Sequence, residues 1–189
     1  MKLALVLGTS AAALEEFQRA RAFARTNALE LRVIAVNDAI KDCPVKPHAF
    51  CTVISGQVAA GRFLDGVNAD GVLMFARRPS PELPAACVKP KWQGTSGLYA
   101  VQIALEELGA EGVILAGVPI DAGHGARSPH SLMGEPARVE RYRAEWIKAL
   151  PAIKHRVRSM SGWTRDLLGA PSPDWLTQLT EQADHRLAA

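Results

Sequence analysis

Short apolar runs alternate with longer amphipathic segments along this chain. Most of the runs are rich in β-branched or long aliphatic residues, and several end at Gly, Ser or Asn. Continuous apolar runs of this length predict strands that are covered on both faces, as in a parallel sheet. The predicted strands are residues 3–7, 32–36, 49–54, 71–75 and 112–118.

The segments between these runs have helical spacing. In residues 11–26, apolar side chains recur every three or four positions, which predicts an amphipathic helix. A second helix is predicted from Ser96 to about Gly109, and a further helix, short strand and turn follow in residues 140–169. The predicted buried face of the second helix consists of Leu98, Val101, Leu105 and Leu108.

Strands alternating with helices predict an α/β fold, a three-layer Rossmann-like domain with a mostly parallel central sheet. We assign residues 1–160 to a Rossmann-like nucleotide-binding domain and residues 161–189 to a C-terminal helical extension. A chain of 189 residues, 48% hydrophobic and 22% charged, suits one globular domain and not a disordered chain.

Composition and cysteine spacing indicate where the protein is located and which kinds of ligand it binds. No apolar run reaches the length of a membrane span and the first residues do not resemble a signal peptide, so we expect a cytoplasmic protein. Cys43, Cys51 and Cys87 lack the paired spacing of zinc or redox sites, and we predict reduced thiols and no metal site. The net charge of +3 and its local basic clusters favour a small anionic ligand over nucleic acid.

Polar and small residues follow the predicted strands. In an open parallel sheet the ligand crevice lies beyond the carboxyl ends of the strands, so these positions are the first site candidates. Glycine there lets the backbone approach a ligand, and free N–H groups favour phosphate, although Ser and Thr also simply cap helices. The positions are Gly8, Thr9 and Ser10; Asn37 and Asp38; residues 55–57; Arg77 and Arg78; and residues 119–124.

The sequence GTSG at residues 94–97 opens the second predicted helix and raises the same two alternatives, a helix cap or a ligand contact. Two familiar nucleotide motifs are missing from the chain. The first loop has no second glycine of the GxGxxG type, which disfavours a dinucleotide cofactor. The chain also has no GxxxxGK[ST] motif, which argues against a P-loop ATPase.

Three stretches together resemble the bacterial sialyltransferase-like group and the related MAF/MptE-like proteins, which include hydroxymethylpterin pyrophosphokinases. They are LVLGTSAAALEEF, VIAVNDA and GTSGLYAVQIALEELGAEGVILAGVPID, within residues 3–121. In those families a Gly-x-Gly-Pro-Ser-Leu loop follows the first strand, an Asn ends the second, and a Thr/Ser-Ser-Gly turn opens a helix. A strand of the pattern Leu-x-Gly-hydrophobic-Asp comes next.

The resemblance implies roles for particular residues. Gly8, Thr9 and Ser10 would approach the nucleotide, Asn37 would hydrogen-bond the nucleotide or sugar, and Thr95, Ser96 and Gly97 would hold a cytidine nucleotide. The implied donor is a nucleotide-sugar such as CMP-sialic acid, with a small hydroxylated acceptor. The first loop departs from the family pattern at Ala11 and Ala12, and the family's Asp position is Pro119, with Asp121 two residues later.

A transfer of this kind needs a general base, and His124 in the loop after residue 118 is our candidate, with Asp121 as a second catalytic candidate. Three functions stay open. They are a nucleotide-sugar-dependent transferase, a pyrophosphokinase with magnesium on Asp38, Asp121 and Glu135, and a non-catalytic nucleotide- or partner-binding protein. A homo-oligomer is compatible with each of them.

Overall fold

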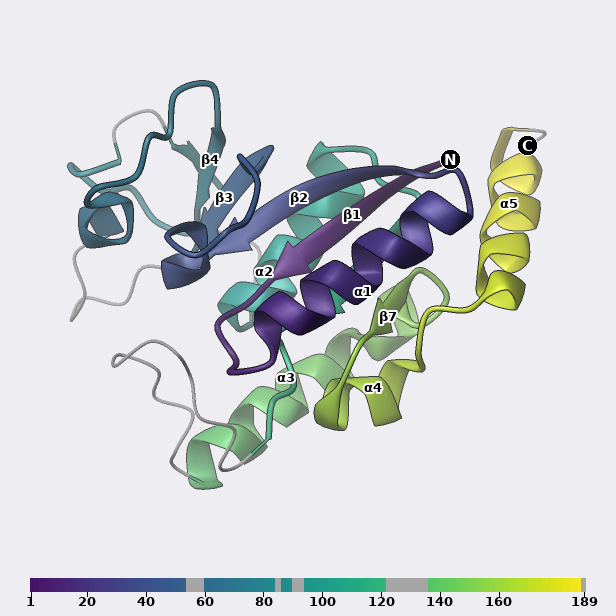
Figure 1. Ribbon diagram of the computed structural model, residues 1–189. Coiled ribbons are helices and arrows are strands. Elements are labelled where there is room, and N and C mark those ends of the chain that lie inside the picture. Colours follow the sequence, from purple (N-terminus) through teal and green to yellow (C-terminus); the bar gives the residue numbers. More distant parts are fainter. Residues whose placement is uncertain (54–59, 84–85, 90–93, 122–135, 188–189) are drawn as a thin grey trace.

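The computed structural model describes residues 1–53, 60–83, 86–89, 94–121 and 136–187 (Figure 1). In this part of the chain seven strands form one sheet in the order β5-β4-β3-β2-β1-β6-β7, and all neighbouring pairs are parallel. The strands are β1 (Lys2–Leu7), β2 (Glu30–Val36), β3 (Ala49–Thr52), β4 (Leu73–Ala76), β5 (Cys87–Val88), β6 (Gly112–Ala116) and β7 (Val157–Ser159). The predicted α/β fold with a mostly parallel sheet is confirmed.

Helices cover both faces of the sheet. Side chains of α2 (Ser96–Gln102), α3 (Pro136–Ile153) and α4 (Gly162–Leu168) pack on one face, where Val6, Ile34 and Leu115 point. The α1 (Ala13–Thr26) and α5 (Pro173–Leu187) side chains pack on the other face, against Leu3, Leu5 and Leu7. The result is a three-layer Rossmann-like domain.

Burial on both faces explains why the strands read as unbroken apolar runs. Residues Leu3 to Leu7 of the central strand β1 are at most 1% exposed. β1 pairs with β2 on one side and with β6 on the other, with Leu3 opposite Leu31 and Gly112. Because the chain places β2 to β5 on one side of β1 and then crosses to β6, the strand order reverses between β1 and β6.

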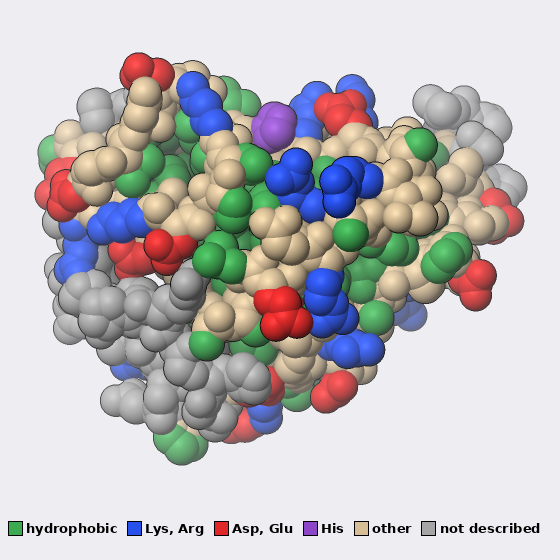
Figure 2. All heavy atoms as spheres, viewed as in Figure 1, with side chains coloured by type: hydrophobic (Ala, Val, Ile, Leu, Met, Phe, Trp, Pro, Cys, Tyr) green, Lys and Arg blue, Asp and Glu red, His purple; other side chains and the backbone are tan. Residues whose placement is uncertain are grey.

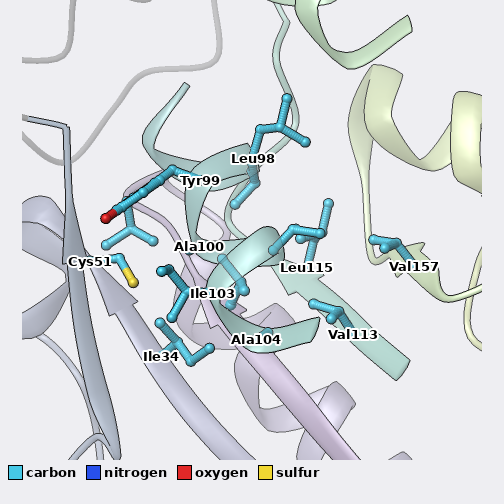
Figure 3. Close-up of a cluster of buried hydrophobic side chains, with 14 of the residues drawn as sticks. Ile34, Cys51, Leu98, Tyr99, Ala100, Ile103, Ala104, Val113, Leu115 and Val157 are labelled. Carbon is cyan, nitrogen blue, oxygen red and sulfur yellow. The ribbon is translucent and has the colours of Figure 1, made fainter. Parts of the chain in front are cut away.

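The helix predicted for residues 96–109 is interrupted. α2 ends at Gln102 and a π-helical turn, η3 (Ile103–Glu107), follows, with the Leu108 N–H bonded to the Ile103 carbonyl at 3.0 Å. The buried face is wider than predicted, since Leu98, Tyr99, Ala100 and Val101 are all buried in one cluster with side chains of the sheet and of α3. Figure 3 shows Leu98, Tyr99, Ala100, Ile103 and Ala104 among side chains of the sheet.

The predicted boundary at residue 160 falls between β7 and α4. The residues after it are largely helical, and their apolar side chains pack into the clusters on both faces of the sheet. Trp175 and Leu179 of α5 are each 1% exposed and pack with Leu3, and the Trp175 indole N–H donates to the His155 carbonyl at 3.1 Å. Within the described residues, no helix is both long and apolar enough to cross a membrane.

Candidate functional site

A hydrogen-bonded chain of side chains joins the carboxyl ends of β2 and β3 to the start of α2. The Thr52 hydroxyl donates to Asn37 Oδ1 at 2.9 Å, and Asn37 Nδ2 donates to Ser96 Oγ at 3.2 Å. Thr52 is fully buried, whereas Asn37 and Ser96 are half-buried. Two of the residues expected to contact a ligand, Asn37 and Ser96, are therefore brought together although 59 positions separate them.

Arg77 closes this chain into a ring. Its backbone N–H donates to the Thr52 carbonyl at 3.3 Å, which extends the pairing of β3 with β4 by one residue. Its guanidinium Nη2 donates to the Gly94 carbonyl, two residues before Ser96, and Arg77 Cζ lies 5.9 Å from the centroid of the Tyr99 ring. We call Asn37, Thr52, Arg77 and Ser96 the polar ring.

The backbone conformation of Asn37 directs its side chain into the polar ring. Its φ is +52°, in the left-handed region where Asn is the most tolerated residue after glycine. It begins the short 3-10 helix η1 (Asn37–Ile40), whose residues Ala39 and Ile40 are buried. The turn thus directs the Asn37 amide toward β3 and α2, and non-glycine residues with such φ values concentrate at functional sites.

Two charged side chains, one in the polar ring and one on α3, have buried atoms without a hydrogen-bond partner in the described part of the chain. They are Arg77 Nε and Glu145 Oε2, the latter on α3. Burial lowers the pKa of Arg77 and the Glu145 carboxylate opposes this shift, so the two charges sense one another. A guanidinium stays charged at neutral pH, and an unpaired buried donor of this kind is costly until something accepts its hydrogen bond.

Thr95, Ser96 and Gly97, at the start of α2, have different roles. Thr95 Oγ1 accepts hydrogen bonds from the Leu98 N–H and from the Trp146 indole N–H, each at 3.2 Å, so Thr95 caps the helix and attaches it to α3. A Cβ on Gly97 would come within 2.9 Å of Val118 Cγ1, so Gly97 permits close packing against the residues after β6. Of the three expected ligand contacts, only Ser96 belongs to the polar ring.

The first loop approaches another loop closely. A Cβ on Gly8 would lie 2.2 Å from the Gly117 carbonyl oxygen, and the Gly8 and Ser10 N–H groups donate to Ala116 and Gly117 at 2.8 and 3.3 Å. The close approach that Gly8 permits is thus to Gly117. Neither Thr9 nor Ser10 caps α1, because its N-cap residue is Ala12. Thr9 and Asp42 both line a small hollow beside this loop.

A buried carboxylate lies beneath this contact. Glu16 is 2% exposed, and its Oε2 accepts the Gly117 N–H at 2.7 Å. Glu16 Oε1 and Ser10 Oγ have no partner among the residues described. Glu16 could have been noticed in the sequence, because it falls on the apolar stripe with Ala13 and Ala20.

Asp121 follows β6, which β1 separates from β2 in the sheet. Its Oδ1 accepts the Trp163 N–H at 3.1 Å and pairs with Arg143 Nη2 at 3.3 Å. Arg143 also donates to the carbonyl of Ile120, whose φ is +52°, an outlier for a β-branched residue. Asp121 therefore fixes α3 and α4 to the segment that leaves β6.

The remaining site candidates do not come together in the described part of the structure. His124 and Glu135 lie outside the described residues. Asp38 pairs with Lys41 at 3.4 Å after β2, and β1 lies between β2 and β6, so Asp38 and Asp121 follow strands about 10 Å apart. In the segments that the structure describes, no group of three or more His, Cys, Asp or Glu side chains could hold a metal ion.

Thr52 and Glu145 are the site residues that the sequence did not predict. A polar residue in the apolar run at 49–54 was the available signal for Thr52, whereas nothing local marks Glu145 among the charged residues of α3. Comparisons of the sequence with models of known families and with curated proteins gave no match.

Proposed function

We propose that the protein binds a nucleotide or nucleotide-sugar at the polar ring. The observation that carries this proposal is the convergence of Asn37, Thr52, Arg77 and Ser96 on the carboxyl edge of a parallel sheet. Ligands of open α/β sheets bind at this edge, and short polar side chains at fixed positions suit the hydroxyls and base edges of a nucleotide.

The resemblance to sialyltransferase-like proteins makes a cytidine nucleotide the first ligand to test and a glycosyl transfer from CMP-sialic acid to a small hydroxylated acceptor the first reaction. Asn37 and Ser96 are the two resemblance-implied contacts that also hydrogen-bond to each other. His124 and Asp121 are the proposed catalytic pair for that reaction, since a base must take the proton of the acceptor hydroxyl.

The experiment is a thermal-shift screen against CMP, UDP, GDP, ATP and CMP-sialic acid, with and without magnesium. A ligand that binds only the folded state raises the unfolding midpoint. Ser96→Ala should reduce the shift produced by a cytidine nucleotide, because it removes one member of the polar ring. Ser161→Ala is the matched control, since Ser161 precedes α4 beyond β7, remote from β2 and β3.

Each result has a defined meaning. A metal-independent shift with CMP that Ser96→Ala reduces supports the transferase, and sugar transfer by the parent and by His124→Ala would be measured next. A shift with ATP that requires magnesium favours the pyrophosphokinase instead. Equal shifts in Ser96→Ala and Ser161→Ala would show that the nucleotide does not bind at the polar ring.

A further inference from the structure

The structure offers two positions for an anionic group, and they differ in charge. Near the first loop, Glu15 and Glu16 lie in the first turn of α1 and Asp42 lines the adjacent hollow. The polar ring itself contains the Arg77 guanidinium, which donates to the Gly94 carbonyl. Coulomb energies make a phosphate less favourable beside the carboxylates than beside the guanidinium.

Two backbone N–H groups of the first loop, residues 8–10, already donate hydrogen bonds within the protein. Gly8 and Ser10 donate their N–H groups to Ala116 and Gly117, so these two donors are not available to a phosphate. Gly117 O fills the space that a Gly8 Cβ would take. The features that make a Gly-rich loop a phosphate site, free N–H groups and open space, are used here for packing two loops together.

The hydrogen bonds of the polar ring have a direction. Thr52 donates to Asn37, and Asn37 donates to Ser96. Ser96 Oγ accepts a hydrogen bond from Asn37, and within the described chain no group accepts the proton of the Ser96 hydroxyl. A hydroxyl in this state can donate, so the group that it meets in a ligand is a hydrogen-bond acceptor.

We propose that the anionic group of the ligand, a phosphate or carboxylate, binds to the Arg77 guanidinium and the Ser96 hydroxyl and not at the Gly8–Ser10 loop. The proposal deepens the proposed function and rests on it for the identity of the nucleotide. Arg77 Nε has no hydrogen-bond partner among the described residues, and an anion that reaches the guanidinium would accept its hydrogen bond. Charge-assisted hydrogen bonds of this kind are the strong ones in binding sites.

Glu145 lies on α3 next to Trp146, whose indole N–H donates to Thr95 Oγ1 at the start of α2, so its carboxylate lies near the proposed anion site. Its carboxylate is close enough to act on the pKa of Arg77, although among the described residues no ion pair within 4.0 Å joins the two. A fixed negative charge near the guanidinium opposes a bound anion. Removal of the charge at Glu145 should therefore tighten anion binding, which is the opposite of the effect expected at Arg77.

The test is isothermal titration calorimetry of the full chain at 0.15 M salt with three probes: inorganic pyrophosphate, CMP and cytidine. Arg77→Gln should weaken pyrophosphate and CMP about ten- to a hundredfold and leave cytidine within about threefold of the parent. Glu145→Gln should tighten pyrophosphate severalfold. Arg78→Gln is the matched control, because Arg78 is the exposed neighbouring arginine and should shift each dissociation constant by less than about threefold.

Arg77→Lys keeps the charge and guards against misfolding of Arg77→Gln, and it should retain more pyrophosphate affinity than Arg77→Gln. CMP binding that is equal in the parent and in a folded Arg77→Gln variant would overturn the anion site and leave the proposed function intact. Pyrophosphate binding that depends on Arg77, without CMP or cytidine binding, would sustain the anion site and overturn the nucleotide assignment. Absence of binding by all three probes would overturn the anion site and the cytidine nucleotide as its ligand.

Discussion

The Thr52 hydroxyl donates to Asn37 Oδ1 at 2.9 Å, from a side chain that is completely buried at the end of β3. This contact holds the amide of Asn37 in one orientation, so that its nitrogen faces Ser96. The buried hydroxyl thus sets the direction of every hydrogen bond between itself and the crevice.

Thr52→Val keeps the shape of the side chain and removes the donor. We expect the free energy of unfolding to fall by about 1–2 kcal/mol, because Asn37 Oδ1 loses its partner in a part-buried position. Urea denaturation measures the change. Thr177→Val is the control, since the exposed Thr177 hydroxyl only reaches the Pro173 carbonyl within α5, and its effect should stay below about 0.5 kcal/mol.

Gly8→Ala tests the contact between the loops after β1 and β6. Its Cβ would lie 2.2 Å from the Gly117 carbonyl oxygen, so the two loops must separate, and we expect a loss of about 3 kcal/mol or more in unfolding free energy. Gly66→Ala is the comparison. Gly66 has φ +74° and open space around it, so only the conformational cost of about 1 kcal/mol applies. Similar losses in the two variants would contradict the close approach at Gly8.

Asp121 and Glu140 pair with the same arginine in different surroundings. Asp121 also accepts the Trp163 N–H, whereas the Glu140 side chain is 71% exposed. Asp121→Ala should lower the unfolding free energy by about 1–2 kcal/mol, and Glu140→Ala should change it by less than about 0.5 kcal/mol. Thermal or urea denaturation decides between them, and an equal effect would mean that Asp121 does not secure α4.

The three cysteines should differ in thiol reactivity. Burial raises the pKa of Cys51 far above its ordinary value and raises the pKa of Cys43 to a smaller extent, whereas Cys87 is exposed. Because the thiolate is the reactive form, labelling at pH 8 should modify Cys87 first, Cys43 more slowly and Cys51 only after unfolding. Mass spectrometry of the labelled peptides gives the order. Early modification of Cys51 in folded protein would show that β3 is accessible.

The fold was predictable because each buried strand appears in the sequence as a short continuous run of apolar residues. The runs at 3–7, 32–36 and 112–118 became β1, β2 and β6 with small changes at their ends. The π-helical turn at Ile103–Glu107 was not predictable, because residues 96–109 have one continuous helical pattern in which nothing local marks the change.

The site was only partly predictable for the same reason. Asn37 and Ser96 follow from their places after a strand and at the start of a helix, two positions that a sequence pattern reveals. Glu145 and Arg77 approach one another through the packing of α3 on α2, which no local pattern encodes. The role of glycine was likewise ambiguous, since Gly8 and Gly97 serve packing between loops and elements.

The central position of β1 also governs the order in which the protein can fold. β1 precedes the other described strands along the chain, yet one of its two edges pairs with β6, more than 100 residues later. Until residues 112–116 are synthesised, that edge has unpaired backbone groups and the buried face of α1 is incomplete. A chain truncated before β6 therefore lacks β6 and β7 and leaves β1 as an exposed edge strand, which favours aggregation.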